Sequence, residues 1–194
     1  MQSVCEGEYI MAKLVLAMFM SLDGYVAGPN GEFAPPPWSA EVGEAWVDHN
    51  LKNAGHVIYG RANFEFNKAY WTSAAAAGQP ETEAMNRLPK TVVSRSLSGD
   101  PGWNAKLVSG DLSAAVAGLK RSVTQGEVYS FGGAGLAESL MRQGLVDEYY
   151  LMVTPNLLGD GKRLFAAGVA KRELELIQAR PLDVGSVILH YRRK

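Results

Sequence analysis

Four short motifs carry residue types that could bind a ligand, and each falls where an apolar segment gives way to a loop or helix, on the side where α/β sheets bind ligands. They are Ser21-Leu22-Asp23-Gly24, Gly60-Arg61, Ser94-Arg95 and Phe131-Gly132-Gly133-Ala134-Gly135. Glycine lets a backbone approach a ligand closely, and arginine presents a planar fork of donors that matches a phosphate monoester. Where a helix follows, its N-terminus adds unpaired N–H groups and the positive end of its dipole. The motifs therefore predict a ligand site, and the glycine turn with the helix after it suits a pyrophosphate.

The stretch from Glu127 to Gly144 contains the most complete of these motifs. Residues 127–131 predict a short strand, and two glycines lead from it into a helix that Gly144 ends. The apolar face of this helix consists of Leu136, Ala137, Leu140 and Met141. The spacing Gly133-x-Gly135 lacks the third glycine of the dinucleotide fingerprint G-x-G-x-x-G. A tight strand-to-helix turn without a ligand therefore stays open as the alternative.

Apolar patterns predict the elements that position these motifs. The continuous apolar run at residues 13–20 predicts a strand covered on both faces. Ser39 is expected to cap a helix that runs to about residue 53, and Asp111 to cap another. Further strands are predicted at residues 56–59, 90–94, 105–108 and 147–154, with two alternating strands around 174–176 and 187–191. This order predicts an α/β fold: a mixed, mostly parallel central sheet flanked by helices, with antiparallel C-terminal strands.

The chain is expected to contain one domain. Its 194 residues fit a single unit, and no repeat or linker interrupts them. Met11-Ala12-Lys13 is a natural start for that unit. We therefore expect residues 11–194 to form the domain and residues 1–10 to form an N-terminal extension, either ordered or disordered.

Composition excludes several classes of partner. The formal net charge of −1 argues against nucleic acid and acidic membrane surfaces, because both attract proteins with a basic excess. The single Cys5 cannot form an internal disulfide, and the apolar run after Lys13 is too short to span a bilayer. The acidic residues before that run do not fit a signal peptide, so we expect a cytoplasmic protein. The histidines lack metal-ligand spacing, so no metal site is predicted.

The order and spacing of the motifs resemble the dihydrofolate reductase-like family. The matching phrases are SLDGYVA, VIYGRANFE, TVVSRSL and VYSFGGAGLAESLMRQGLVDEYYLMVTPNLLGDGKRLF, and they cover most of residues 13–165. The chain is most similar to the reductase domain of riboflavin biosynthesis and to its uncharacterised bacterial relatives. The resemblance implies an NADPH-dependent reductase that transfers a hydride to a small heterocyclic substrate, either pyrimidine-like or pterin-like.

The resemblance also implies how the motifs would hold NADPH. Gly60-Arg61 would lie at a helix N-terminus beside the pyrophosphate, and Ser94-Arg95 would hold the 2′-phosphate of the adenosine. The turn within residues 131–135 would approach the cofactor closely, through an unusual cis peptide bond between its first two glycines. The backbone of Val26 and Ala27 would pass near the nicotinamide.

Hydride transfer to a C=N or C=O group also needs a proton source nearby. The resemblance places Asp23 near the substrate, and the alternative is a turn aspartate that bonds its own backbone ahead of Gly24. In folate reductases the acid lies in the helix after the first loop, which here carries Glu41, Glu44 and Asp48 on one face. Three carboxylates on one helix face are typical of a solvated surface. No acid aligns with the folate-binding one, which argues against dihydrofolate as substrate.

Other residues of the long loops are candidates for contacts with the substrate. Phe33 and Trp38 are expected either to stack on a planar ring or to anchor the first loop. Lys162 is a candidate partner for a substrate phosphate.

Two further hypotheses concern activity and assembly. Because no acid aligns, a nucleotide-binding protein without catalysis, acting as a sensor or assembly partner, is the alternative function. A flavodoxin-like or Rossmann-type fold is disfavoured, since no full glycine fingerprint follows the first strand. The late strands offer more apolar surface than the predicted helices cover, which predicts a homodimer joined through the C-terminal sheet region.

Overall fold

The computed structural model describes residues 11–32 and 35–194. The strands are β1 (Leu14–Ser21), β2 (Tyr25–Ala27), β3 (Ala54–Gly60), β4 (Lys90–Val93), β5 (Ala105–Val108), β6 (Glu127–Phe131), β7 (Glu148–Thr154), β8 (Lys162–Arg163), β9 (Leu174–Pro181) and β10 (Val187–Arg193). The helices are α1 (Ala40–Val42), η1 (Gly43–Asp48), α2 (His49–Asn53), α3 (Arg61–Trp71), α4 (Pro80–Arg87), α5 (Leu112–Ser122) and α6 (Ala134–Arg142). The expected N-terminal extension, residues 1–10, and the candidate substrate contact Phe33 lie outside the described residues.

A central sheet organises the described part of the chain. It has eight strands in the order β5-β4-β3-β6-β1-β7-β10-β9, and β2 pairs separately with β8. The strands from β5 to β7 run parallel, whereas β10 is antiparallel to β7 and β9 is antiparallel to β10. This topology confirms the predicted mixed, mostly parallel sheet with antiparallel C-terminal strands.

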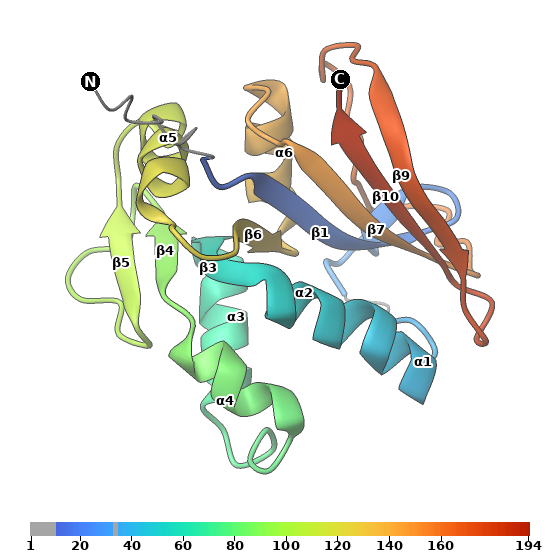
Figure 1. Ribbon diagram of the computed structural model, residues 1–194, viewed down its shortest axis with the longest axis horizontal. Helices are drawn as coiled ribbons and strands as arrows, with labels where there is room; N and C mark the ends of the chain where they lie inside the picture. Colours follow the sequence, from blue (N-terminus) through green and yellow to red (C-terminus); the bar gives the residue numbers. More distant parts are fainter. Residues whose placement is uncertain (1–10, 33–34) are drawn as a thin grey trace, which may run out of the picture.

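Helices cover both faces of the sheet, with α5 and α6 on one face and α1 to α4 on the other (Figure 1). The central strand β1 contributes to both layers. Its Leu14, Leu16 and Met18 join the cluster packed under α5 and α6, whereas Val15 and Ala17 join the cluster under α1 and η1. All five side chains are at most 4% exposed. Burial on both faces explains why the apolar run of β1 is continuous rather than alternating.

The helix after the two glycines is confirmed as α6. Its predicted apolar face is buried: Leu136, Ala137, Leu140 and Met141. Gly144 ends the helix with a left-handed φ of +67° and donates its N–H to the Met141 carbonyl at 3.0 Å. The next residue, Leu145, donates to the Leu140 carbonyl at 2.9 Å. This pair of bonds is a Schellman motif, which a residue with a side chain adopts only under strain.

The helix predicted from residue 39 is also confirmed, but its middle part is π-helical instead of α-helical. Ser39 caps it by accepting the Val42 N–H at 3.2 Å, as predicted. Residues 43–48 are π-helical, however, and this wider turn leaves no trace in the apolar pattern. The indole of Trp46 packs on the ring of Phe19, with 4.3 Å between the ring centroids.

Sequence reasoning missed three short elements. The helix α4 begins with Pro80 at its first position and has Glu81 and Glu83 in its first turn, a start signal that the pattern did contain. The strands β2 and β8 have three residues and two residues. Segments of that length are too short to show a period.

The buried Glu148, at the start of β7, is bonded both to His190 of β10 and to the exposed Lys13, which directly precedes β1. Glu148 Oε2 lies 2.9 Å from His190 Nε2, and Glu148 Oε1 accepts a bond from Lys13 Nζ at 2.6 Å. The bond with His190, and after it the bond with Lys13, lowers the pKa of Glu148 to about 2, although burial of the carboxylate opposes this. The folded state therefore favours the ionised form more strongly than the unfolded state does.

We expect the Glu148→Gln variant to be less stable than the wild type, by an amount that depends on pH. A depressed folded-state pKa contributes stability above the ordinary value of 4.5, and this contribution is lost as the pH falls toward about 2. The difference in unfolding free energy should be on the order of 3 kcal/mol at neutral pH. Urea unfolding at pH 7, 4.5 and 3 measures it. The exposed Glu173, changed to Gln, is the control, and an equal deficit at all three pH values would contradict the expectation.

Candidate functional site

The four predicted motifs meet at the carboxyl ends of the strands. They follow or end strands β4, β3, β6 and β1, which are parallel neighbours in that order. Ser94 follows β4, Gly60 ends β3, Gly132 follows β6 and Ser21 ends β1. Open α/β sheets bind their ligands outside the carboxyl ends of their strands. The strand order therefore assembles a candidate nucleotide site from segments far apart in the sequence.

The loop after β4 is bonded to the start of α3. Arg61 Nη1 donates to Ser96 Oγ at 3.1 Å, while Arg61 Nε pairs with Glu65 at 2.8 Å. Ser94 is buried, and its Oγ accepts the N–H groups of Ser96 and Leu97 at 3.2 and 3.0 Å. These bonds fix the shape of the loop that presents Arg95.

Arg95 itself is exposed. Among the residues that the structure describes, no carboxylate lies within 4 Å of its guanidinium. Its charge is therefore open to an anionic ligand, whereas that of Arg61 is shared with Glu65.

The turn between β6 and α6 is made by two left-handed glycines. Gly132 has a φ of +69° and Gly133 a φ of +82°. Every described peptide bond is trans, so the cis bond implied by the resemblance is absent: two positive φ angles make the turn instead. Gly133 is the N-cap of α6 and Gly60 the N-cap of α3, and neither helix start has a side-chain cap. Both helix starts therefore keep N–H groups for an anion.

One residue that the sequence did not single out joins these two helix starts. Asn63, in the first turn of α3, donates its Nδ2 hydrogen to the carbonyl of Phe131 at 2.5 Å. An asparagine near a helix start is common on protein surfaces, so its type and position carried no signal. Only the pairing of β3 with β6 brings it to the glycine turn.

Asp23 holds the loop after β7. Its two carboxylate oxygens accept the N–H groups of Leu158 and Gly159 at 3.1 and 2.8 Å, and Ser21 Oγ donates to it at 2.6 Å. The Ser21 bond, followed by these backbone bonds, lowers the pKa of Asp23 to about 2. The carboxylate is therefore ionised near pH 7. This geometry favours a positioning role, and it argues against Asp23 as the proton donor.

The residues predicted to lie near the nicotinamide belong to the small β2–β8 pair. Val26 and Ala27 are in β2, and the exposed Lys162 of β8 lies opposite Ala27. Beside it, Arg163 donates to the hydroxyl of Tyr25 at 2.9 Å, and its guanidinium lies 4.5 Å from the centre of that ring. The two strands β2 and β8 therefore form a small hydrogen-bonded unit, called here the β2–β8 flap, next to the end of β1.

The helix carboxylates are placed differently from the expectation. Glu41 pairs with Arg180 at 3.1 Å and accepts the N–H of Asp183 at 2.7 Å, so it ties its helix to the β9–β10 hairpin. Glu44 is exposed, and the side chain of Trp38 is 59% exposed. These contacts argue against Glu41 and Glu44 as the acid, because long-range packing gives the first a structural partner and leaves the second in solvent.

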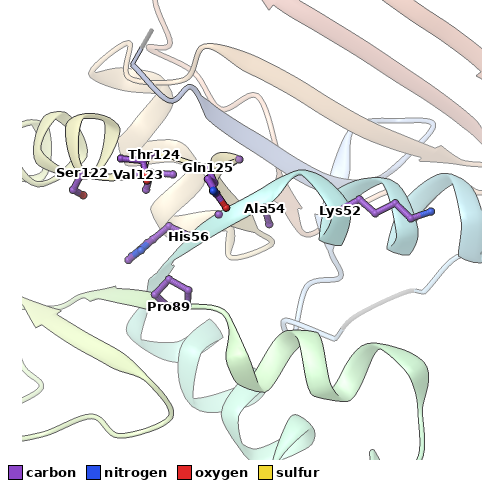
Figure 2. Close-up of a pocket in the computed structure, with 10 residues that line it drawn as sticks. Lys52, Ala54, His56, Pro89, Ser122, Val123, Thr124 and Gln125 are labelled. Atoms are coloured by element: carbon purple, nitrogen blue, oxygen red, sulfur yellow. The ribbon is translucent and has the colours of Figure 1, made fainter. Parts of the chain in front are cut away.

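A hollow lies at the opposite end of the strands, beside the amino ends of β3 and β6. It has a volume of about 480 Å³ and is lined by Lys52, Ala54, Gly55, His56, Pro89 and residues 122–126 (Figure 2). Two of its polar side chains have partners: His56 with Thr91 at 2.9 Å, and Lys52 with Asp48 at 3.4 Å. Burial lowers the pKa of His56 to about 4. Because this hollow is at the amino ends of β3 and β6, we assign the candidate site to the carboxyl edge.

Two searches gave no positive finding. Among the described residues, no group of three or more His, Cys, Asp or Glu is arranged to hold a metal ion. In the same part of the chain, no helix is long and apolar enough to cross a membrane.

Comparisons with known proteins agree with this architecture. A family model described as the RibD C-terminal domain matches residues 12–188. The uncharacterised protein YyaP of Bacillus subtilis is 26% identical over 185 residues, which cover 92% of this chain and 94% of that protein. A putative riboflavin biosynthesis protein from a Shewanella species has a TM-score of 0.74 at 21% identity, covering 95% of this chain and 99% of that one.

A longer protein is also similar. RibD of Acinetobacter baumannii has a TM-score of 0.69 at 19% identity; the match covers 95% of this chain but 58% of that one. At such identities the solved structures show the fold alone. The family model, in contrast, spans nearly all of the described residues. The chain therefore belongs to the RibD C-terminal domain family, which is a family of reductases.

Proposed function

We propose that this protein is an NADPH-dependent reductase of a small heterocyclic substrate, pyrimidine-like or pterin-like. The observation that carries the proposal is the meeting of the four motifs at the carboxyl ends of neighbouring strands. The uncapped starts of α3 and α6 suit a pyrophosphate, and the open guanidinium of Arg95 suits a 2′-phosphate. The residues present therefore fit NADPH, which supplies a hydride when bound.

The chain's own residues would bind and orient the reactants. The left-handed turn at Gly132-Gly133 leads into the start of α6, whose uncapped N–H groups would bind a pyrophosphate. The β2–β8 flap and the loop held by Asp23 border the end of β1, where a substrate would lie beside the nicotinamide. Because Asp23 is ionised and Glu41 is bonded elsewhere, we propose that an ordered water delivers the proton.

A second candidate function rests on the same observation about the acids. Asp23 is ionised near pH 7, Glu41 is bonded to Arg180 and Glu44 is exposed, which favours a nucleotide-binding protein without catalysis. Following NADPH oxidation in the presence of pyrimidine and pterin heterocycles separates the two functions. Oxidation with any of them supports the reductase. Tight NADPH binding without oxidation across the panel supports the sensor or assembly role.

We expect NADPH to bind more tightly than NADH, and Arg95→Ala to remove most of that preference. A charge-assisted bond to the 2′-phosphate is worth about 1.5–3 kcal/mol. Calorimetry with both nucleotides measures the preference. Arg87→Ala is the control. Arg87 is also exposed, but it precedes β4 and therefore lies at the amino ends of the strands. Equal affinity of the wild type for NADPH and NADH would contradict this assignment of the loop after β4.

We also propose a homodimer joined through β9 and β10. The edge strand β9 carries Leu176 and Ile177, which are 51% and 45% exposed. A long edge strand with exposed apolar side chains is a surface that proteins usually cover. Sedimentation at micromolar concentration should give a dimer, and Leu176→Asp should give a monomer. Phe66→Asp, on α3, should stay dimeric; a monomeric wild type would contradict the proposal.

A further inference from the structure

We infer that Asn63 is a positioning residue that holds the Gly132–Gly133 turn in the shape required by the cofactor pyrophosphate. The inference rests on the proposed function, and it assigns a role to a residue outside the four motifs. Asn63 lies in the first turn of α3, and its Nδ2 donates to the carbonyl of Phe131, directly before the turn, at 2.5 Å. This bond joins the first turn of α3 to the residue that precedes the turn before α6.

The turn also packs against this asparagine. A Cβ added to Gly133 would lie 3.2 Å from Asn63 Cβ and 3.3 Å from Asn63 Nδ2. A Cβ added to Gly132 would lie 3.5 Å from the same nitrogen. A side chain at either glycine would therefore point toward Asn63. The glycines leave room for the asparagine.

A row of side chains along α3 fixes the orientation of the Asn63 amide. Asn67 Nδ2 donates to Asn63 Oδ1 at 3.1 Å and to the Asn63 carbonyl at 2.8 Å. Trp71 Nε1 in turn donates to Asn67 Oδ1 at 3.2 Å. The amide oxygen of Asn63 is thus used as an acceptor and its nitrogen as a donor, so a flipped amide would lose both contacts.

These contacts hold the starts of α3 and α6 in a fixed arrangement relative to each other. An anion bound between the starts of α3 and α6 needs both sets of N–H groups at a fixed separation. Asn63 belongs to α3 and bonds the residue before the α6 turn, so it sets that separation. As a neutral amide it does so without placing a negative charge beside phosphates. It acts through the turn, and its loss should affect ligands that carry a pyrophosphate.

The test compares two ligands that differ in that group. NADPH contains the pyrophosphate, whereas adenosine 2′,5′-bisphosphate has the 2′-phosphate and no pyrophosphate bridge. Calorimetry on Asn63→Ala should show the Kd for NADPH rising about tenfold and that for the bisphosphate changing less than about twofold. Asn53→Ala is the matched control, because Asn53 Nδ2 also donates to a backbone carbonyl, that of His49, at 2.7 Å, but at the other edge of the sheet. It should leave both Kd values unchanged.

A second variant tests the same inference with Asn63 in place. Asn67→Ala removes the partner that orients the amide, and it should weaken NADPH binding less than Asn63→Ala, again without affecting the bisphosphate. This arm decides the matter if circular dichroism shows Asn63→Ala to be unfolded. Equal weakening of both ligands, or NADPH binding at the wild-type level in both variants, would overturn the inference. Failure of the wild type to bind NADPH would instead refute the proposed function, and the inference with it.

Discussion

Gly133→Ala should weaken NADPH binding by roughly 10²–10⁴-fold, because a distorted turn would lose about two charge-assisted bonds to phosphate. The φ of +82° strains any residue with a Cβ, and that Cβ would press on Asn63 at 3.2 Å rather than point toward a ligand. The turn and the helix start behind it must then move. Titration of the variant with NADPH, followed by calorimetry, measures the loss.

Gly144→Ala provides the control for this experiment. Gly144 has a similar left-handed φ of +67° and lies at the other end of the same helix. Its added Cβ would meet the flexible end of the Arg172 side chain, so the main cost is backbone strain. Both variants should therefore unfold at lower temperature than the wild type, and only Gly133→Ala should lose NADPH. If both lose NADPH equally, general destabilisation rather than the turn is responsible.

Asp23→Asn should lower turnover about 100-fold through displacement of a loop and not through loss of a proton donor. An amide cannot accept the N–H groups of both Leu158 and Gly159, since its nitrogen is itself a donor. One of these N–H groups then has no acceptor, and the loop beside the proposed substrate position moves. A shift of about 1 Å at an active site can cost 100-fold in rate. Steady-state kinetics on an identified substrate measures the change.

The pH dependence separates the two roles of Asp23. Its folded-state pKa of about 2 lies below its ordinary value of 3.8, so its carboxylate bonds are intact above that value and are lost as the pH falls toward 2. The wild-type turnover should therefore show no titration of Asp23 between pH 5 and 8. Asp160→Asn, in the same loop, should keep near wild-type turnover, because Asp160 bonds the neighbouring Gly161 N–H. A titration in that range that disappears in Asp23→Asn would restore the donor role.

The sequence by itself determined most of the elements of this fold because their signals are local. The continuous run of β1, the apolar face of α6 and the left-handed stop at Gly144 each depend on residues close in the chain. The caps at Ser39 and Asp111 bond residues three and two positions away. These elements were predictable from residue types and short spacings. The family was predicted from the resemblance in the order of the motifs.

Only the tertiary structure decided how the site is assembled. The order β4-β3-β6-β1 places the four motifs side by side, and no local pattern records that order. The rest of the sheet, β1-β7-β10-β9, gives Asp23 partners in the loop after β7 and gives Glu41 a partner in β9. These contacts change the proposed roles of both residues. Asn63 reaches Phe131 for the same reason. Contacts between residues distant in the chain depend on which strands pair, and strand pairing is settled by burial of the whole sheet rather than by any single segment.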